Sequence, residues 1–144
     1  MNIEQIIKNG ESQIVEFKES FDREAIETAV AFSNSKGGII FVGVADDGKM
    51  RGITIGAETL REWSNYTSQV TEPTVIPELE SLEFNGKKIV IIRVQEFPLK
   101  PVSFRGRCFK RVSNSNRQMS PQEIAQMHLQ STGNKLGCLA RCCC

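Results

Sequence analysis

The most apolar segment of the sequence is the run IIFVGVA at positions 39–45. Because no polar residue alternates with the apolar ones, the run predicts a strand that is covered on both faces, at the centre of a sheet. Gly37 and Gly38 precede it and tolerate the positive φ of a tight turn. The sequence DDGK at 46–49 follows as a turn signal, so we expect residues 50–53 to return as a short strand.

Four segments carry the pattern or the boundary signals of helices. Residues 1–10 have isoleucines at helical spacing and end at a glycine, and residues 22–33 follow a capping serine or aspartate. Residues 57–70 place Leu60, Trp63, Tyr66 and Thr67 on one stripe, which predicts a buried face. The last helix is expected over 120–130, because SPQE at 120–123 combines a capping box with proline at the first helical position.

The remaining strands are predicted as hairpins. A strand is expected at 13–18, strands at 80–84 and 88–94 flank Asn85-Gly86, and strands at 102–104 and 108–112 flank a third turn. Three to four helices with about seven strands predict an α+β domain whose sheet is mixed and largely antiparallel. No Gly-x-Gly-x-x-Gly and no P-loop lysine occur in the sequence, which argues against a doubly wound nucleotide-binding fold.

Charge is distributed unevenly along the chain. The totals nearly balance, with 18 basic and 17 acidic residues, but residues 1–30 are mainly acidic and residues 97–122 contain bases and no acid. Like-charge blocks of this kind point to an anionic partner. The alternative is a solvated face whose charges are balanced by neighbours in the fold.

The cysteines favour a reducing compartment. Cys108 is isolated in the body of the chain and is expected to be a small buried apolar residue, and the other four fall within 138–144. We therefore predict a cytoplasmic protein. No apolar run approaches the ~20 residues of a membrane helix, and the first residues lack the pattern of a signal peptide. We interpret residues 131–144 as a linker followed by a cysteine-rich tail added by cloning or read-through.

Several carboxylates are candidates for a metal site. Glu16 and Lys18 lie two positions apart on one predicted strand and therefore on one face, and Asp46 and Asp47 follow the buried strand. If the two strands are neighbours, these groups converge, and carboxylates suit Mg²⁺ or Mn²⁺. Such an ion activates water for attack on a phosphodiester, and a lysine stabilises the developing charge. On spacing alone, a chance Glu-x-Lys and an ordinary Asp-Asp-Gly turn explain the same residues.

The basic segment offers donors for phosphate. Hydroxyl, amide and guanidinium groups cluster where a predicted strand ends in a serine- and asparagine-rich loop. The candidate nucleic-acid-binding residues are Lys100, Arg105, Arg107, Lys110, Arg111, Ser115, Asn116 and Arg117. The competing interpretation of Arg117 is an arginine that braces the loop.

Ordered motifs along the chain resemble the Schlafen AlbA-like domain. They are ESQIVEFK at 11–18, AFSNSKGG at 31–38, FVGVADDG at 41–48, KPV at 100–102, RVSNSN at 111–116 and SPQEI at 120–124. The resemblance covers about residues 1–130, which we take as the domain. The Schlafen AlbA-like domain is found in prokaryotic proteins described as transcriptional regulators or divergent ATPases, and in animal Schlafen proteins.

The resemblance implies binding of DNA or RNA. In some Schlafen members the domain resembles a metal-dependent endoribonuclease that uses two glutamates five positions apart and an aspartate after the Gly-Val strand. Glu11, Glu16 and Asp46 match that pattern, and Lys18 would assist them. Animal Schlafens join two lobes and carry a Cys/His zinc site, whereas this chain has one lobe and no matching internal set. A single lobe would have to dimerise to enclose a duplex.

Three functions follow as hypotheses. The first is a nucleic-acid-binding module of a longer transcriptional regulator, with mainly phosphate contacts and without a membrane partner. The second is an endoribonuclease that requires Mg²⁺ or Mn²⁺ and uses Glu11, Glu16, Asp46 and Lys18. The third is an oligomerisation or sensor module, which predicts a dimer without affinity for nucleic acid. The sequence leaves open whether the protein is an enzyme.

Overall fold

The computed structural model describes residues 2–131, and the cysteine-rich segment lies outside them. This part of the chain forms an α+β fold with two four-stranded sheets, which confirms the predicted fold class. The helices are α1 (Ile3–Asn9), α2 (Arg23–Ser33), α3 (Thr59–Val70) and a last helix at residues 121–131. The strands are β1 (Val15–Lys18), β2 (Gly38–Val42), β3 (Thr71–Glu72), β4 (Glu78–Phe84), β5 (Lys87–Val94), β6 (Ser103–Phe104), β7 (Arg107–Val112) and β8 (Ser115–Gln118).

The first sheet has the order β1-β2-β5-β4, so the apolar run supplies a central strand as predicted. β1 runs parallel to β2, and β5 pairs antiparallel with both β2 and β4. Gly37 enters β2 with φ +76°, and a Cβ there would lie 2.7 Å from the carbonyl oxygen of Val94. Only glycine fits that turn, and it brings β2 beside β5.

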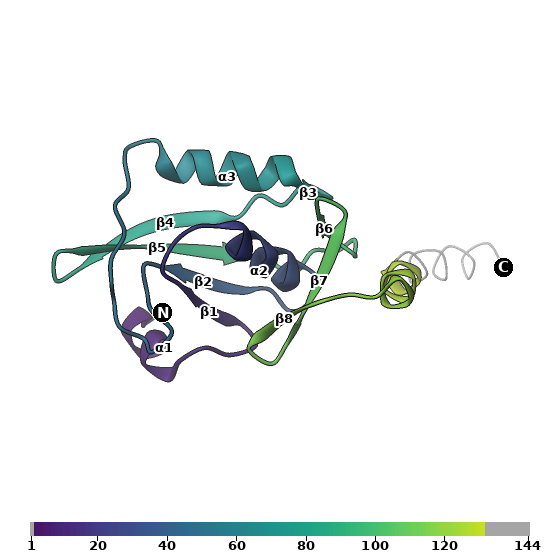
Figure 1. Ribbon diagram of the computed structural model, residues 1–144, viewed down its shortest axis with the longest axis horizontal. Coiled ribbons are helices and arrows are strands. Elements are labelled where there is room, and N and C mark those ends of the chain that lie inside the picture. Colours follow the sequence, from purple (N-terminus) through teal and green to yellow (C-terminus); the bar gives the residue numbers. More distant parts are fainter. Residues whose placement is uncertain (1, 132–144) are drawn as a thin grey trace.

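The second sheet has the order β3-β6-β7-β8 and covers α2 from the side opposite the first sheet. One core cluster joins Ile26 and Phe32 of α2 to Ile40 of the first sheet and to Phe104 and Phe109 of the second. A helix between two sheets is covered on most of its surface, which explains why α2 is buried along nearly its whole length. Figure 1 shows α2 in front of the first sheet, with α3 along β4.

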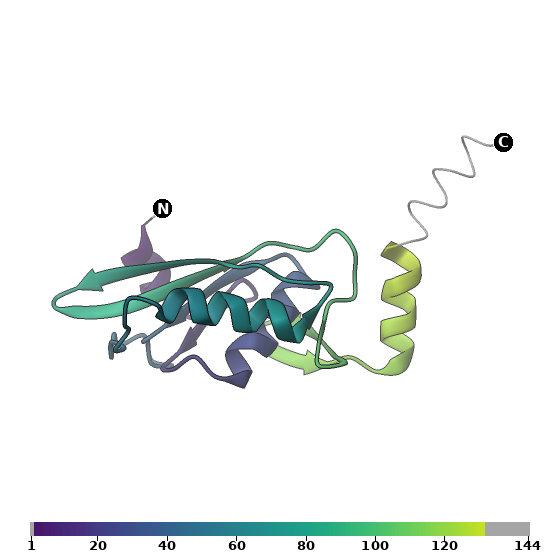
Figure 2. The ribbon, with the colours of Figure 1, turned by 90° about the horizontal axis from the view of Figure 1, so that it is seen from above.

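The other face of the first sheet packs against α1. Ile7 of α1 joins Phe17, Phe41 and Ile89 in a second core cluster. The β4–β5 hairpin and the last helix lie at opposite ends of the molecule in both views (Figures 1 and 2). Within residues 2–131, the helices are too short or too polar to cross a membrane.

Two local predictions were wrong. Residues 50–53 form no return strand; a single bridge joins Val44 to Met50. Both edges of β2 are already paired with β1 and β5, so the returning chain has no free edge there. Conversely, Ser115–Gln118 was expected to be a loop and is strand β8, which pairs with β7 across the short turn at 113–114.

Candidate functional site

Two of the predicted carboxylates meet at the start of β1. Glu11 lies in the loop between α1 and β1, and its Oε1 accepts a hydrogen bond of 3.2 Å from the backbone N–H of Phe17. Burial, a hydrogen bond to Glu16 and the charge of Glu16 raise the pKa of Glu11 to about 7; Asp46 adds to this, and the Phe17 N–H opposes it. Near neutral pH, the protonated form of Glu11 is therefore favoured far more than in an exposed glutamate.

The charge of Glu16 is neutralised from inside the protein. Glu16 is buried on β1, and its Oε1 accepts a bond of 3.0 Å from Nη1 of Arg111 on β7. The Arg111 side chain is completely buried, with its guanidinium carbon 4.9 Å from the centre of the Phe32 ring. The Glu16 carboxylate therefore faces a buried cation, and that cation lies over the Phe32 ring.

The remaining donors of Arg111 bind the chain around the same loop. Nη2 donates to the carbonyl oxygens of Ser12 (2.8 Å) and Val15 (3.1 Å), and Nη1 also donates to Oδ1 of Asn116 at 2.8 Å. Asn116 in turn donates to the Thr28 hydroxyl of α2 at 2.7 Å. We call Glu16, Arg111 and Asn116 the interior clamp, because they join β1 and α2 to the second sheet.

This placement changes the interpretation of Arg111 and Asn116, which the sequence suggested as phosphate ligands. The donors that phosphate would need are used inside the domain, except Nε of Arg111, which is buried and has no hydrogen-bond partner among residues 2–131. The alternation of side chains along a strand predicts that Arg111 is buried. Arg111 stands two positions after Phe109 and therefore faces the same, core-facing side of β7.

Lys18 and Asp47 have local roles in this structure. Nζ of Lys18 lies 2.6 Å from Oε2 of Glu24 on α2. Burial lowers the pKa of Lys18, but the bond to Glu24 and the neighbouring acids outweigh burial, so the pKa is raised and the lysine is charged. Oδ1 of Asp47 accepts a bond of 3.0 Å from the backbone N–H of Lys49 and closes the turn after β2.

The donor set does not fit a metal ion in this arrangement. Asp46 is exposed and acts on Glu11 electrostatically, while one oxygen of Glu16 is bound to Arg111. Among residues 2–131, no group of three His, Cys, Asp or Glu side chains lies close enough together to hold a metal ion. Asp46 is near enough to help raise the pKa of Glu11, and a Mg²⁺ or Mn²⁺ site at these three acids stays a prediction.

The predicted basic residues divide into two groups. Arg105 and Arg107 lie on either side of the β6–β7 turn, and Arg117 lies on β8; all three are exposed, and none forms a salt bridge within the described residues. Lys100 and Lys110 form ion pairs with Glu96 and Glu123. The pairing of β7 with β8 sets Lys110 directly opposite Arg117, and it leaves Ser115 exposed at the turn.

One exposed residue beside Arg105 was not predicted from the sequence. Tyr66 was assigned to the buried stripe of α3, but its side chain is 41% exposed and its hydroxyl accepts a 3.0 Å bond from Nη2 of Arg105. Trp63, on the same stripe, packs as predicted and stacks on Phe21 with ring centres 4.5 Å apart. Helical spacing alone does not show that Tyr66 stays exposed while its neighbour on the same stripe, Thr67, is buried.

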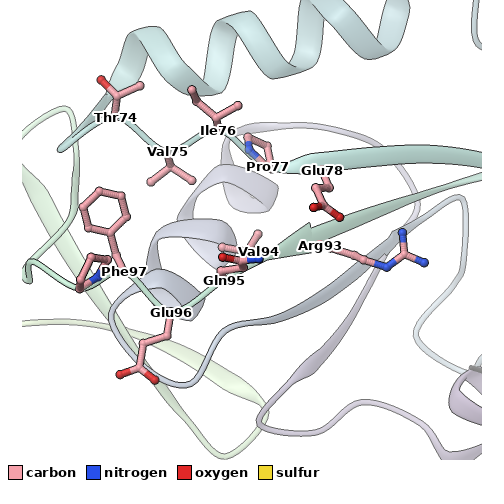
Figure 3. Close-up of a pocket in the computed structure, with 11 residues that line it drawn as sticks. Thr74, Val75, Ile76, Pro77, Glu78, Arg93, Val94, Gln95, Glu96 and Phe97 are labelled. Carbon is pink, nitrogen blue, oxygen red and sulfur yellow. The ribbon is translucent and has the colours of Figure 1, made fainter.

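A groove of about 410 Å³ lies elsewhere, where the chain approaches β4 and leaves β5. In Figure 3 the side chains of Val75 and Phe97 lie between the two segments, and Glu78 and Arg93 lie at one end. None of the predicted site residues lines this groove. It is therefore separate from both the carboxylate pair and the exposed arginines.

Comparison with known proteins bears on the fold and the family. The DIP2311 protein of Corynebacterium diphtheriae has a similar structure, with a TM-score of 0.63, 20% identity, and coverage of 81% of this chain and 24% of that one. A second similar structure is the N-terminal domain of a protein from Nitrosomonas europaea that is related to the ATP-dependent DNA helicase RecG. Its TM-score is 0.56 and its sequence identity is 17%, and the match covers 83% of this chain and 95% of that domain.

The chain thus spans about a quarter of the first of these structures and nearly the whole of the second. No curated protein matches the sequence. The model of the family described as "Schlafen, AlbA_2" matches residues 11–120, which include the carboxylate pair, the interior clamp and the exposed arginines. The chain belongs to the Schlafen AlbA_2 family.

Proposed function

We propose that this domain binds nucleic acid through phosphate contacts on a basic surface made of Arg105, Arg107 and Arg117. The observation that carries the proposal is that these three exposed arginines occupy one sheet and its end turn without a salt bridge in residues 2–131. An unpaired guanidinium brings its full charge and a planar set of donors to a phosphate. Membership of a family usually related to nucleic acids supports the same function.

Lys110 and Lys100 extend this surface more weakly. Lys110 lies beside Arg117 but is paired with Glu123 of the last helix, and Lys100 is paired with Glu96. By strand alternation Lys110 lies on the same side of the second sheet as its register partner Arg117, whereas Arg107, three positions from Lys110, lies on the other side of β7. Contacts to phosphate do not read the base sequence, so we expect steep salt dependence and little sequence preference.

Fluorescence anisotropy with labelled RNA and DNA tests the proposal. The variant Arg105→Ala/Arg107→Ala/Arg117→Ala is compared with Arg23→Ala/Arg51→Ala/Arg61→Ala, which removes the same charge from exposed arginines that each face an acid. We expect the first variant to bind more weakly and to lower the slope of log K against log salt by up to about 0.9 for each phosphate that the protein no longer neutralises. Equal weakening in both variants, or no binding by the wild type at low salt, would contradict the proposal.

A second candidate is a metal-dependent nuclease that uses Glu11, Glu16 and Asp46, with Lys18. Its support is the carboxyl pair, since a carboxyl with a pKa raised to about 7 beside a second acid is typical of functional sites. The bond from Arg111 to Glu16 weighs against it. Incubation of the wild type and Glu16→Gln with tRNA and Mn²⁺ separates the two functions. Cleavage by the wild type alone favours the nuclease, and equal cleavage, or none, removes it.

The rival oligomerisation module makes a different prediction. It requires a dimer in solution and no affinity for RNA or DNA at low salt. Because the binding module is also proposed to form a homodimer, the affinity for nucleic acid distinguishes the two, and sedimentation tests the dimer. The proposal also includes a homodimer, a longer parent regulator and a cytoplasmic location.

A further inference from the structure

Tyr66 stands out among the aromatic residues. Its side chain is 41% exposed, whereas the other aromatic side chains in residues 2–131 are buried or half-buried. It lies near the end of α3, and the backbone N–H of Arg105 in the β6–β7 turn donates to the carbonyl of Val70 at the end of the same helix, at 3.1 Å. An exposed ring thus stands beside Arg105, which forms no salt bridge within residues 2–131, and Arg107 follows two positions later at the start of β7. Figure 1 shows this end of α3 close to β3 and β6.

The contact between Tyr66 and Arg105 leaves the ring available. Nη2 of Arg105 bonds the hydroxyl at 3.0 Å, but the guanidinium carbon is 6.0 Å from the ring centre. These two distances place the guanidinium at the hydroxyl end of the ring and not flat against its face. The same guanidinium lies 5.8 Å from the centre of the Phe104 ring, so Arg105 is held between two aromatic side chains.

A small cavity of about 240 Å³ lies against this turn. Gln69 and Ser103 line it with an amide and a hydroxyl group, and Arg105 and Glu72 line it as well. Thr71 also lines it, but its hydroxyl is bonded to Thr67 and Val75. A carboxylate in the lining disfavours a phosphate and accepts hydrogen bonds from amino groups of a base. The charge pattern at the cavity therefore favours a base over a phosphate, and Arg107 is not among the lining residues.

We propose that Tyr66, Arg105 and Arg107 form a site for an unpaired nucleotide, with the base stacked on Tyr66 and the flanking phosphates held by the arginines. This inference rests on the proposed function and specifies its ligand as single-stranded nucleic acid. Bases in a duplex are already stacked on each other and present edges and phosphates, whereas an unpaired base offers its face to an aromatic ring.

The test uses one labelled single-stranded oligonucleotide and a duplex of the same strand with its complement. Tyr66→Leu removes the aromatic face, while Tyr66→Phe and Tyr66→Trp retain one. We expect Tyr66→Leu to weaken binding of the single strand about tenfold, or about 1.4 kcal/mol, and to leave duplex binding within about twofold. Tyr66→Phe and Tyr66→Trp should stay close to the wild type on both ligands.

The outcomes separate this site from the general binding surface. If the wild type binds neither ligand, the proposed function itself fails. If the wild type binds but Tyr66→Leu leaves the single strand unaffected, or weakens both ligands equally, the stacking site is overturned while the basic surface stands. A large loss of single-strand affinity in Tyr66→Trp also overturns the stacking site. Thermal unfolding of each variant verifies folding, and the two aromatic variants keep the test decisive if Tyr66→Leu does not fold.

Discussion

Arg111 and Arg105 lie six positions apart on one hairpin, and the fold uses them in opposite ways. Arg111 is buried and bonded to Glu16, Asn116 and two backbone carbonyls, whereas Arg105 is exposed and bonded to a tyrosine hydroxyl. The interior clamp uses its charge to join two sheets, and the basic surface leaves its charge available to a ligand. The number of basic residues in a segment therefore does not show how much charge is exposed to a partner. Four predictions test the contrast between the interior clamp and the basic surface.

The largest effect is expected for Arg111→Met. Removing the guanidinium leaves the Glu16 carboxylate buried without its cation, and loss of one partner of a buried pair costs about 3–5 kcal/mol of the free energy of unfolding. Urea unfolding measures the loss. The double variant Arg111→Met/Glu16→Leu should recover a large part of it, because no charge then remains unpaired. An Arg111→Met protein as stable as the wild type would contradict the structural role of the clamp.

A smaller effect is expected for Asn116→Ala. The substitution removes the bonds to Arg111 and to the Thr28 hydroxyl, and the loss of bonds in a partly buried network costs about 1–3 kcal/mol. Ser115→Ala, one position earlier on β8, is the matched control, because Ser115 is exposed and its change should cost less than about 0.5 kcal/mol. Equal effects of the two substitutions in urea unfolding would remove the distinction between them.

The carboxylate pair predicts a dependence of stability on pH. The folded protein raises the pKa of Glu11 from 4.5 to about 7, so it binds this proton more tightly than the unfolded chain does. The contribution is complete below pH 4.5 and is lost as pH rises through about 7, so stability should fall over that window. Urea midpoints measured across it should decline in the wild type and decline less in Glu11→Gln. Identical slopes in the two proteins would show that Glu11 is not the group responsible.

The smallest effect on stability is expected for Arg105→Ala/Arg107→Ala. Both side chains are exposed, and we expect a loss of less than about 0.5 kcal/mol in the free energy of unfolding. Nucleic-acid affinity should nevertheless fall, measured by anisotropy at low salt. For the interior clamp we expect the opposite, since substitutions there change stability most. A large stability loss in this double variant would mean that the turn serves the fold instead of a ligand.

Local signals in the sequence predicted most elements. The β4–β5 hairpin turns at Asn85-Gly86 as expected, and the last helix begins with the reciprocal bonds between Ser120 and Glu123 that its capping box predicts. Tyr66 and β8 were misassigned. Periodicity does not report which side chains of an apolar stripe stay exposed, and a serine- and asparagine-rich segment has no strand pattern of its own. β8 forms because β7 offers an edge and α2 offers the Thr28 hydroxyl.

By itself, the sequence determined the helices and most of the strands, the central place of the apolar run, and the nearness of Glu11 to Glu16, because these follow from periodicity, turn chemistry and a short separation along the chain. Only the tertiary structure decided which bases are inside and which are outside. Arg111 meets Glu16 across 95 positions of sequence, and that contact depends on how two sheets pack around α2. Burial of a charge is a property of the assembled layers, since only a distant partner compensates the loss of water.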